Sequence, residues 1–119
     1  MNYNNDFRFD LEFGVLEGET WFADMISNNK FEVKTDRRTE ETGNIYIEYQ
    51  SRDKPSGIKT TQADFWVYKV GPGKAIVIET LELKKIITKL VLEGKAYTNI
   101  RGGDNNTSLG VLIRVKDLL

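Results

Sequence analysis

Two residue types are missing from this chain, which has 119 residues but no cysteine and no histidine. Without cysteine, the chain forms neither disulfides nor thiolate-bound zinc sites. Without histidine, it has no Ser-His or Cys-His nucleophilic pair, no histidine-bound metal and no histidine general base. Acid–base or metal chemistry must therefore come from Asp, Glu, Lys or Tyr, and such oxygen ligands suit Mg²⁺ or Mn²⁺.

Long apolar runs are missing as well. No segment approaches the roughly 18 apolar residues that can span a bilayer. Residues 1–6 have neither the basic region nor the apolar stretch of a secretory signal. We therefore expect a cytoplasmic protein with no membrane partner. With 39% hydrophobic and 29% charged residues, the chain fits one globular domain over residues 1–119, with residues 1–10 loosely ordered.

Hydrophobic periodicity predicts an α/β fold with a mixed central β-sheet flanked by helices. Apolar residues recur at helical spacing over residues 11–26 and 81–92, with Thr80 as the N-cap of the second helix. Strands are predicted where apolar residues alternate or run together, over residues 31–36, 44–50, 65–70, 74–79 and 109–115. The first two strands flank a charged turn that ends in Gly43, which favours an antiparallel pair, and residues 98–108 are predicted as a polar loop.

The Glu-Val-Lys triplet near the start of the predicted sheet is the pattern with the clearest chemical meaning. In a strand, residues two apart point to the same face, so Glu32 and Lys34 project together. In phosphodiester hydrolysis, such a carboxylate holds Mg²⁺, and the lysine orients a bound water or stabilises the transition state. A second carboxylate would come from Glu19, Asp24 or Asp36. The alternative interpretation is a solvated charged face on an edge strand.

An upstream carboxylate followed by Glu-x-Lys on a strand is the pattern of the PD-(D/E)XK endonuclease superfamily, and Asp24 with Glu32-Val33-Lys34 resembles it. The stretches 31–38, 43–49, 54–58 and 60–66 are similar to a group of small phage-encoded nucleases, some of them free-standing homing endonucleases. The resemblance covers roughly residues 14–70. It implies a restriction-endonuclease-like core and a Mg²⁺-dependent DNA endonuclease, in which Asp24, Glu32 and Glu19 bind the metal and Lys34 positions the attacking water. Glu17 competes with Glu19 for its role.

A second same-face pair, Glu48 and Gln50, lies on the neighbouring predicted strand. It is an alternative catalytic pair. The other interpretation is that Glu48 is a cross-strand partner for Lys34 or Arg38, which would contribute only about a few tenths of a kcal/mol. Several aromatic residues are interpreted as core or sheet-face residues rather than base-stacking platforms: Tyr46, Tyr49, Trp66 and Tyr68.

Basic residues in turns and loops are candidate DNA contacts, although solvated loops have the same composition. They are Arg37, Arg38, Arg52, Lys54, Lys59 and Arg101. The net charge of −1 argues against a pure nucleic-acid binder, but active-site carboxylates lower the charge of a nuclease. We expect DNA and further copies of the chain as partners, in a homodimer or higher homo-oligomer, and no organic cofactor. The alternatives are a Holliday-junction resolvase, a catalytically silent nucleic-acid-binding protein on the same scaffold, and an α/β interaction module.

Overall fold

The computed structural model describes residues 24–119. Phe31–Leu119 form one compact unit, and residues 24–30 belong to a separate one. Residues 24–28 are helical, in agreement with the helix predicted to end near this point. The expectations that fall on residues 1–23 lie outside the described part of the chain.

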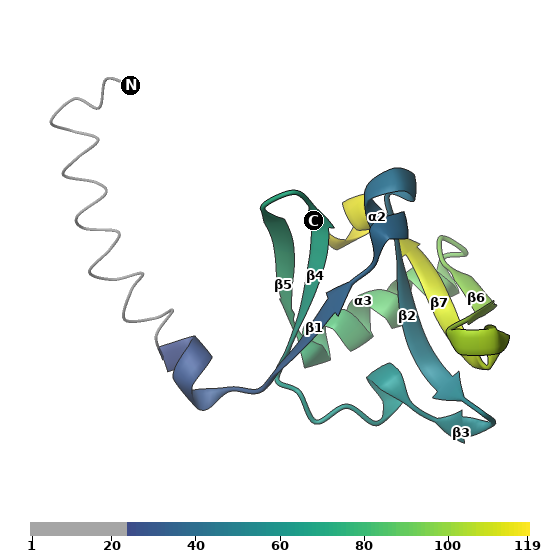
Figure 1. Cartoon of the computed structure of the whole chain (residues 1–119), viewed down its shortest axis with the longest axis horizontal. Coiled ribbons are helices and arrows are strands. Elements are labelled where there is room, and N and C mark those ends of the chain that lie inside the picture. The colour runs from purple at the N-terminus through teal and green to yellow at the C-terminus, as the bar shows by residue number, and fades with distance from the viewer. Residues whose placement is uncertain (1–23) are drawn as a thin grey trace, which may run out of the picture. The chain divides into compact units, whose positions relative to one another are not determined.

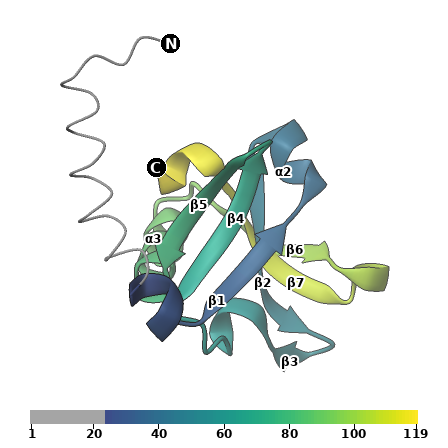
Figure 2. The ribbon, with the colours of Figure 1, turned by 60° about the vertical axis from the view of Figure 1, so that its left-hand side comes forward.

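The larger unit contains two sheets (Figure 1), and the first of them is mixed. Strand β1 (Phe31–Thr35) runs parallel to β4 (Phe65–Gly71), and β4 is antiparallel to β5 (Lys74–Glu79). Figure 2 shows these three strands side by side, with β4 in the centre. The nearly continuous apolar sequence of β4 predicts this central position. The predicted α/β class with a mixed sheet is thereby confirmed.

The second sheet is antiparallel, with the strand order β3–β2–β7–β6. Its strands are β2 (Asn44–Ser51), β3 (Lys54–Pro55), β6 (Tyr97–Gly102) and β7 (Ser108–Arg114). The predicted antiparallel pairing of β1 with β2 is therefore wrong, because β2 pairs with β7 and β1 pairs with β4. The predicted polar loop over residues 98–108 is also wrong. Most of it forms β6 and the start of β7, and the polar side chains of β6 stay hydrated because β6 is an edge strand.

Helix α2 (Arg37–Thr42) explains why β1 and β2 do not form a hairpin. The carboxylate of Asp36 accepts a hydrogen bond from the backbone N–H of Arg38 at 2.9 Å and so caps the N-terminus of the helix. Gly43 ends the helix in a left-handed conformation with φ 72°. The residues predicted as a charged turn thus form a short helix, which carries the chain from the first sheet to the second.

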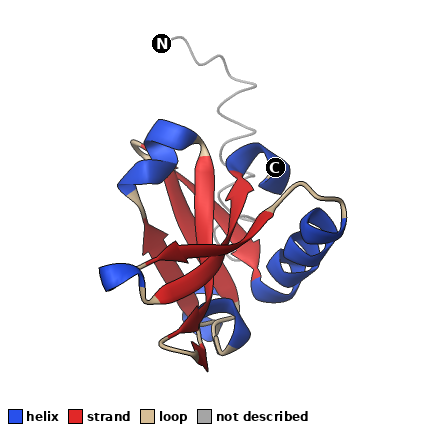
Figure 3. Cartoon of the chain, turned by 90° about the vertical axis from the view of Figure 1, so that its right-hand side faces the viewer, coloured by secondary structure: helices blue, strands red, loops and turns tan. Residues whose placement is uncertain are grey.

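Helix α3 (Thr80–Leu92) packs against β4, β5 and β7 and so contacts both sheets. The Thr80 hydroxyl donates to the carbonyl of Ala63 at 2.6 Å, and the N-cap is Glu79 rather than the predicted Thr80. The chain also forms short 3₁₀ helices, drawn in blue with the other helices in Figure 3: η1 (Gly57–Lys59), η2 (Asp104–Asn106) and η3 (Val115–Leu118). Within residues 24–119, no helix has the length and apolar composition that crossing a bilayer requires.

The hydrophobic core joins the two sheets and α3. Alternate residues of β2 and β7 point into it, and β4, β5 and α3 supply the other side. Its most deeply buried members are Ile45, Ile47, Trp66, Leu83 and Ile113. Each such side chain contributes about 1.5–3 kcal/mol through removal of apolar surface from water. Because Ile45 and Ile47 face the core, Tyr46 and Glu48 are left on the opposite face of β2.

Candidate active site

The Glu32–Lys34 pair lies on β1, and its two side chains share a face, as strand alternation predicts. Lys34 Nζ is 3.1 Å from Glu32 Oε1, and it lies 5.6 Å from the centroid of the Trp66 ring. The Lys34 and Glu32 side chains are 45% and 43% exposed. An ion pair this exposed contributes at most about 1 kcal/mol to stability. Both charged groups are therefore accessible to a ligand at little energetic cost.

Two buried aromatic residues lie beside this pair on β4. The strand register places Glu32 next to Trp66 and Lys34 next to Tyr68. Trp66 Nε1 and the Tyr68 hydroxyl are buried and have no hydrogen-bond partner among the described residues. Burial raises the pKa of the Tyr68 phenol, and the negative charge of Glu32 raises it further. Tyr68 is therefore a neutral phenol at physiological pH and cannot act as a general base.

A pocket of about 230 Å³, which we call the carboxylate pocket, opens beside the pair. Lys34 of β1 and Glu48 of β2 line it together with Asp36, Tyr46, Gly57, Trp66 and Gly103. The Ser56 hydroxyl donates to Glu48 Oε2 at 2.8 Å, which fixes the orientation of that carboxylate. The pocket thus brings together Lys34 and Glu48, two of the predicted catalytic residues, from different sheets.

A second pocket of about 450 Å³, which we call the arginine pocket, adjoins the first. Arg38 of α2 and Arg101 of β6 both line it, so two of the predicted DNA contacts lie together. Its polar and apolar walls come from Asn44, Asn106, Ile100 and Leu112. Asp36, Tyr46 and Gly103 line both pockets, so the two pockets adjoin, and we call them together the groove; Lys34 and Glu48 line only the carboxylate pocket, and Arg38 and Arg101 line only the arginine pocket.

Four other predicted DNA contacts line neither of these two pockets. They are Arg37, Arg52, Lys54 and Lys59. All four are exposed, and Arg52 sits in the turn between β2 and β3 with φ 49°. Lys59 Nζ instead lies 5.1 Å from the centroid of the Tyr49 ring. These residues remain candidate contacts only for a ligand that extends well beyond the groove.

The predicted metal ligands fall in different parts of the chain. Glu19 lies outside the described residues, and Asp24 belongs to the separate unit of residues 24–30. Between Asp24 and Leu119, no three acidic side chains gather in a way that could hold a metal ion. The chemistry of the donors nevertheless fits Mg²⁺, since this ion is usually held by one or two carboxylates and completes its shell with water and substrate phosphate. Glu32 and Glu48 are carboxylates of that kind.

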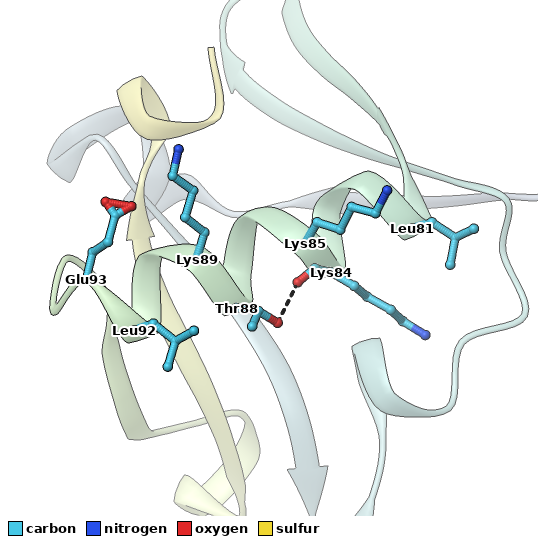
Figure 4. Close-up of a pocket in the computed structure, with 7 residues that line it drawn as sticks. All are labelled: Leu81, Lys84, Lys85, Thr88, Lys89, Leu92 and Glu93. Carbon is cyan, nitrogen blue, oxygen red and sulfur yellow. Dashed lines mark hydrogen bonds between the residues drawn. The ribbon is translucent and has the colours of Figure 1, made fainter.

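A larger hollow, of about 640 Å³, lies on the exposed face of α3 (Figure 4). Leu81 and Leu92 stand at its two ends, with three lysines between them. The carboxylate that lines it, Glu93, is 3.5 Å from Lys95 Nζ. The hollow offers apolar surface and cations, but its lining carboxylate, Glu93, pairs with Lys95, which does not line the hollow. The groove is therefore the better candidate for catalysis.

The sequence predicted Tyr46 as a core or sheet-face residue, and it lies on the sheet face over Gly102 and Gly110, but sequence reasoning missed that it lines the groove. The ring of Tyr46 is half-buried and lines both halves of the groove. Alternation along β2 indicated that Tyr46 lies outside the core, because a residue between Ile45 and Ile47 must point away from the core.

In comparisons with models of protein families, with curated proteins and with solved structures, the chain matches none.

Proposed function

We propose that this chain is a Mg²⁺-dependent phosphodiester hydrolase that acts on DNA, with a restriction-endonuclease-like core. The observation that carries the proposal is the groove made of the two adjoining pockets. It places Lys34 and Glu48 in one pocket, beside Glu32, and Arg38 and Arg101 in the other. Nuclease chemistry needs carboxylates and a cation at the scissile phosphate, with further cations along the backbone.

The two pockets of the groove have different tasks in this proposal. Arg38 and Arg101 bind phosphate oxygens of the strand, because guanidinium groups pair with phosphate through two parallel hydrogen bonds. Lys34 places its ammonium group at the scissile phosphate, where it orients the attacking water or stabilises the charge that develops in the transition state. When bound, Mg²⁺ supplies Lewis-acid activation of the phosphate and of a water molecule.

The residues that would hold the metal are carboxylates near Lys34. Glu32 and Glu48 are the candidates within the larger unit. The Glu32 carboxylate pairs with the Lys34 ammonium group at 3.1 Å, so a metal ion bound by Glu32 would replace this exposed ion pair. A single groove of this kind cuts one strand, so cleavage of both strands requires a homodimer or higher homo-oligomer.

The test is nicking of supercoiled plasmid DNA by the full chain in Mg²⁺ and in EDTA. We expect cleavage only with Mg²⁺, and a loss of about 100- to 1,000-fold in Lys34→Ala, the range seen when one transition-state donor is removed. Lys85→Ala is the matched control, because this lysine is exposed on α3 and does not line the groove. Its activity should equal that of the parent.

Binding supplies a second test with its own matched pair. Arg38→Ala should weaken DNA binding and reduce the salt slope by about one phosphate contact. Lys85→Ala should leave both unchanged, since Lys85 is exposed on α3 and lines neither pocket of the groove. DNA binding without cleavage of any substrate would instead indicate a catalytically silent nucleic-acid-binding protein. Cleavage confined to four-way junctions would indicate a junction resolvase.

A further inference from the structure

The ring of Tyr46 lies across two glycines of the neighbouring strands. A Cβ atom at Gly110 of β7 would come within 2.5 Å of Tyr46 Cζ, and one at Gly102 of β6 within 2.8 Å of the same atom. Neither glycine has a positive φ, so the reason for glycine at these positions is space rather than backbone conformation. One face of the ring therefore rests on the sheet.

Two hydrogen bonds hold the ring in this position. The Tyr46 hydroxyl donates to the carbonyl of Ile100 at 3.0 Å and is 2.9 Å from the Ser108 hydroxyl. Ser108 is only 1% exposed, so the anchor lies deep in the sheet. Since the ring also lines both pockets of the groove, the ring surface that does not rest on the glycines faces the groove. The result is a fixed aromatic surface between Lys34 and the two arginines.

We propose that Tyr46 is a stacking platform for an unpaired base of the substrate. The proposal rests on the proposed function and names its substrate class: DNA with a single-stranded segment next to the cleaved phosphate. In a duplex, the faces of the bases are covered by their neighbours and only base edges are presented in the grooves. A ring that lies flat in a groove can therefore stack only on a base that has left the helix or was never paired.

The surroundings of the ring fit one nucleotide. The arginine pocket has a volume of about 450 Å³, within the range of pockets that enclose small organic ligands and far too small for a duplex. Ile100 and Leu112 add apolar wall, while the amides of Asn44 and Asn106 offer donors and acceptors for the edge of a base. Arg38 and Arg101 supply the cations for its phosphates.

The experiment measures fluorescence of 2-aminopurine in EDTA, so that binding is separated from cleavage. The probes are a single strand, a duplex, and a duplex with a single-stranded tail, each with one 2-aminopurine. We expect the full chain to quench the unpaired probes by stacking and to bind them more tightly than the duplex. Tyr46→Phe should retain the preference for unpaired probes. Tyr46→Leu should weaken binding of those probes by about 5- to 150-fold and leave duplex binding unchanged.

Equal affinity for duplex and unpaired probes, or no quenching with the parent protein, would overturn the proposal. The parent measurement does not depend on how any variant folds, and thermal unfolding checks that both variants fold. Nuclease activity is scored separately, with Mg²⁺ and Lys34→Ala. Quenching without any cleavage would refute the hydrolase and leave the platform standing. Cleavage without quenching or preference would refute the platform alone.

Discussion

Substitution of Gly102 by alanine tests the packing of Tyr46 on the sheet. The added Cβ would lie 2.8 Å from Tyr46 Cζ, 3.0 Å from its hydroxyl oxygen and 3.1 Å from Cε2. The ring cannot simply swing aside, because its hydroxyl is anchored to Ile100 and Ser108. We therefore expect Gly102→Ala to strain the ring or to break its hydrogen bonds.

Two opposing effects determine how much Gly102→Ala changes the free energy of unfolding. Overpacking by one methyl group costs about 1–3 kcal/mol. Replacing a strand glycine by alanine contributes about 0.5–1 kcal/mol in the other direction, because alanine loses less conformational entropy on folding. In a Tyr46→Ala background the overpacking disappears, so Gly102→Ala should then stabilise by about 0.5–1 kcal/mol. The coupling between the two positions should be about 1–3 kcal/mol.

Urea unfolding of the parent, both single variants and the double variant measures this coupling. Gly71→Ala is the matched control, since its Cβ would meet nothing within 4 Å and its φ is not positive. It should be neutral or slightly stabilising in both backgrounds. If Gly102→Ala changed the free energy of unfolding equally with and without the Tyr46 ring, within about 0.5 kcal/mol, the ring would not rest on Gly102. Gly102→Ala should also reduce binding of unpaired DNA.

Three further substitutions test other parts of the structure. Tyr68→Phe removes a buried hydroxyl without a partner among the described residues, so it should stabilise the protein by about 1 kcal/mol at pH 7 in urea unfolding. The folded-state pKa of Tyr68 is raised above its ordinary value of 10, so the free energy of unfolding should be unaffected by this group below pH 10 and should fall by about 1.4 kcal/mol per pH unit above it. The Phe variant should lack this alkaline loss of stability. Asp36→Ala removes the N-cap hydrogen bond of α2 and should cost about 1 kcal/mol in thermal unfolding, whereas Asp36→Asn should retain most of it. Gly57→Ala combines φ 55° with a Cβ only 2.1 Å from the carbonyl oxygen of Glu48, so it should cost about 2–5 kcal/mol, while Gly73→Ala, at φ 66° with open space around it, should cost only about 1–2 kcal/mol.

Hydrophobic periodicity alone predicted most of the elements. The structure has the expected strands where residues alternate around Glu32 and where β4 is apolar, and the expected turn at Gly73. It also has the expected helix where the spacing becomes helical after Thr80. These patterns are local: period and burial along one segment decide whether it forms a strand or a helix. For the same reason, the sequence was sufficient to place Glu32 and Lys34 on one face of β1.

Strand pairing depended on contacts between distant parts of the chain. The sequence favoured a hairpin of β1 and β2, but the capping of α2 by Asp36 and the burial of Ile45 and Ile47 against β7 decided otherwise. Polar residues over 98–108 gave no strand signal, because β6 is an edge strand whose stability comes from backbone pairing with β7.

For the groove too, some features followed from the sequence and others only from the tertiary structure. From the sequence came the residue types, the same-face geometry of Glu32 and Lys34, and the list of cations that included Arg38 and Arg101. Only the tertiary structure brought Lys34 to Glu48, and Arg38 to Arg101, because each pair joins elements whose register is set by packing rather than by spacing along the chain. The position of Tyr46 above two glycines of other strands is decided by the same long-range register, and no pattern within β2 encodes it.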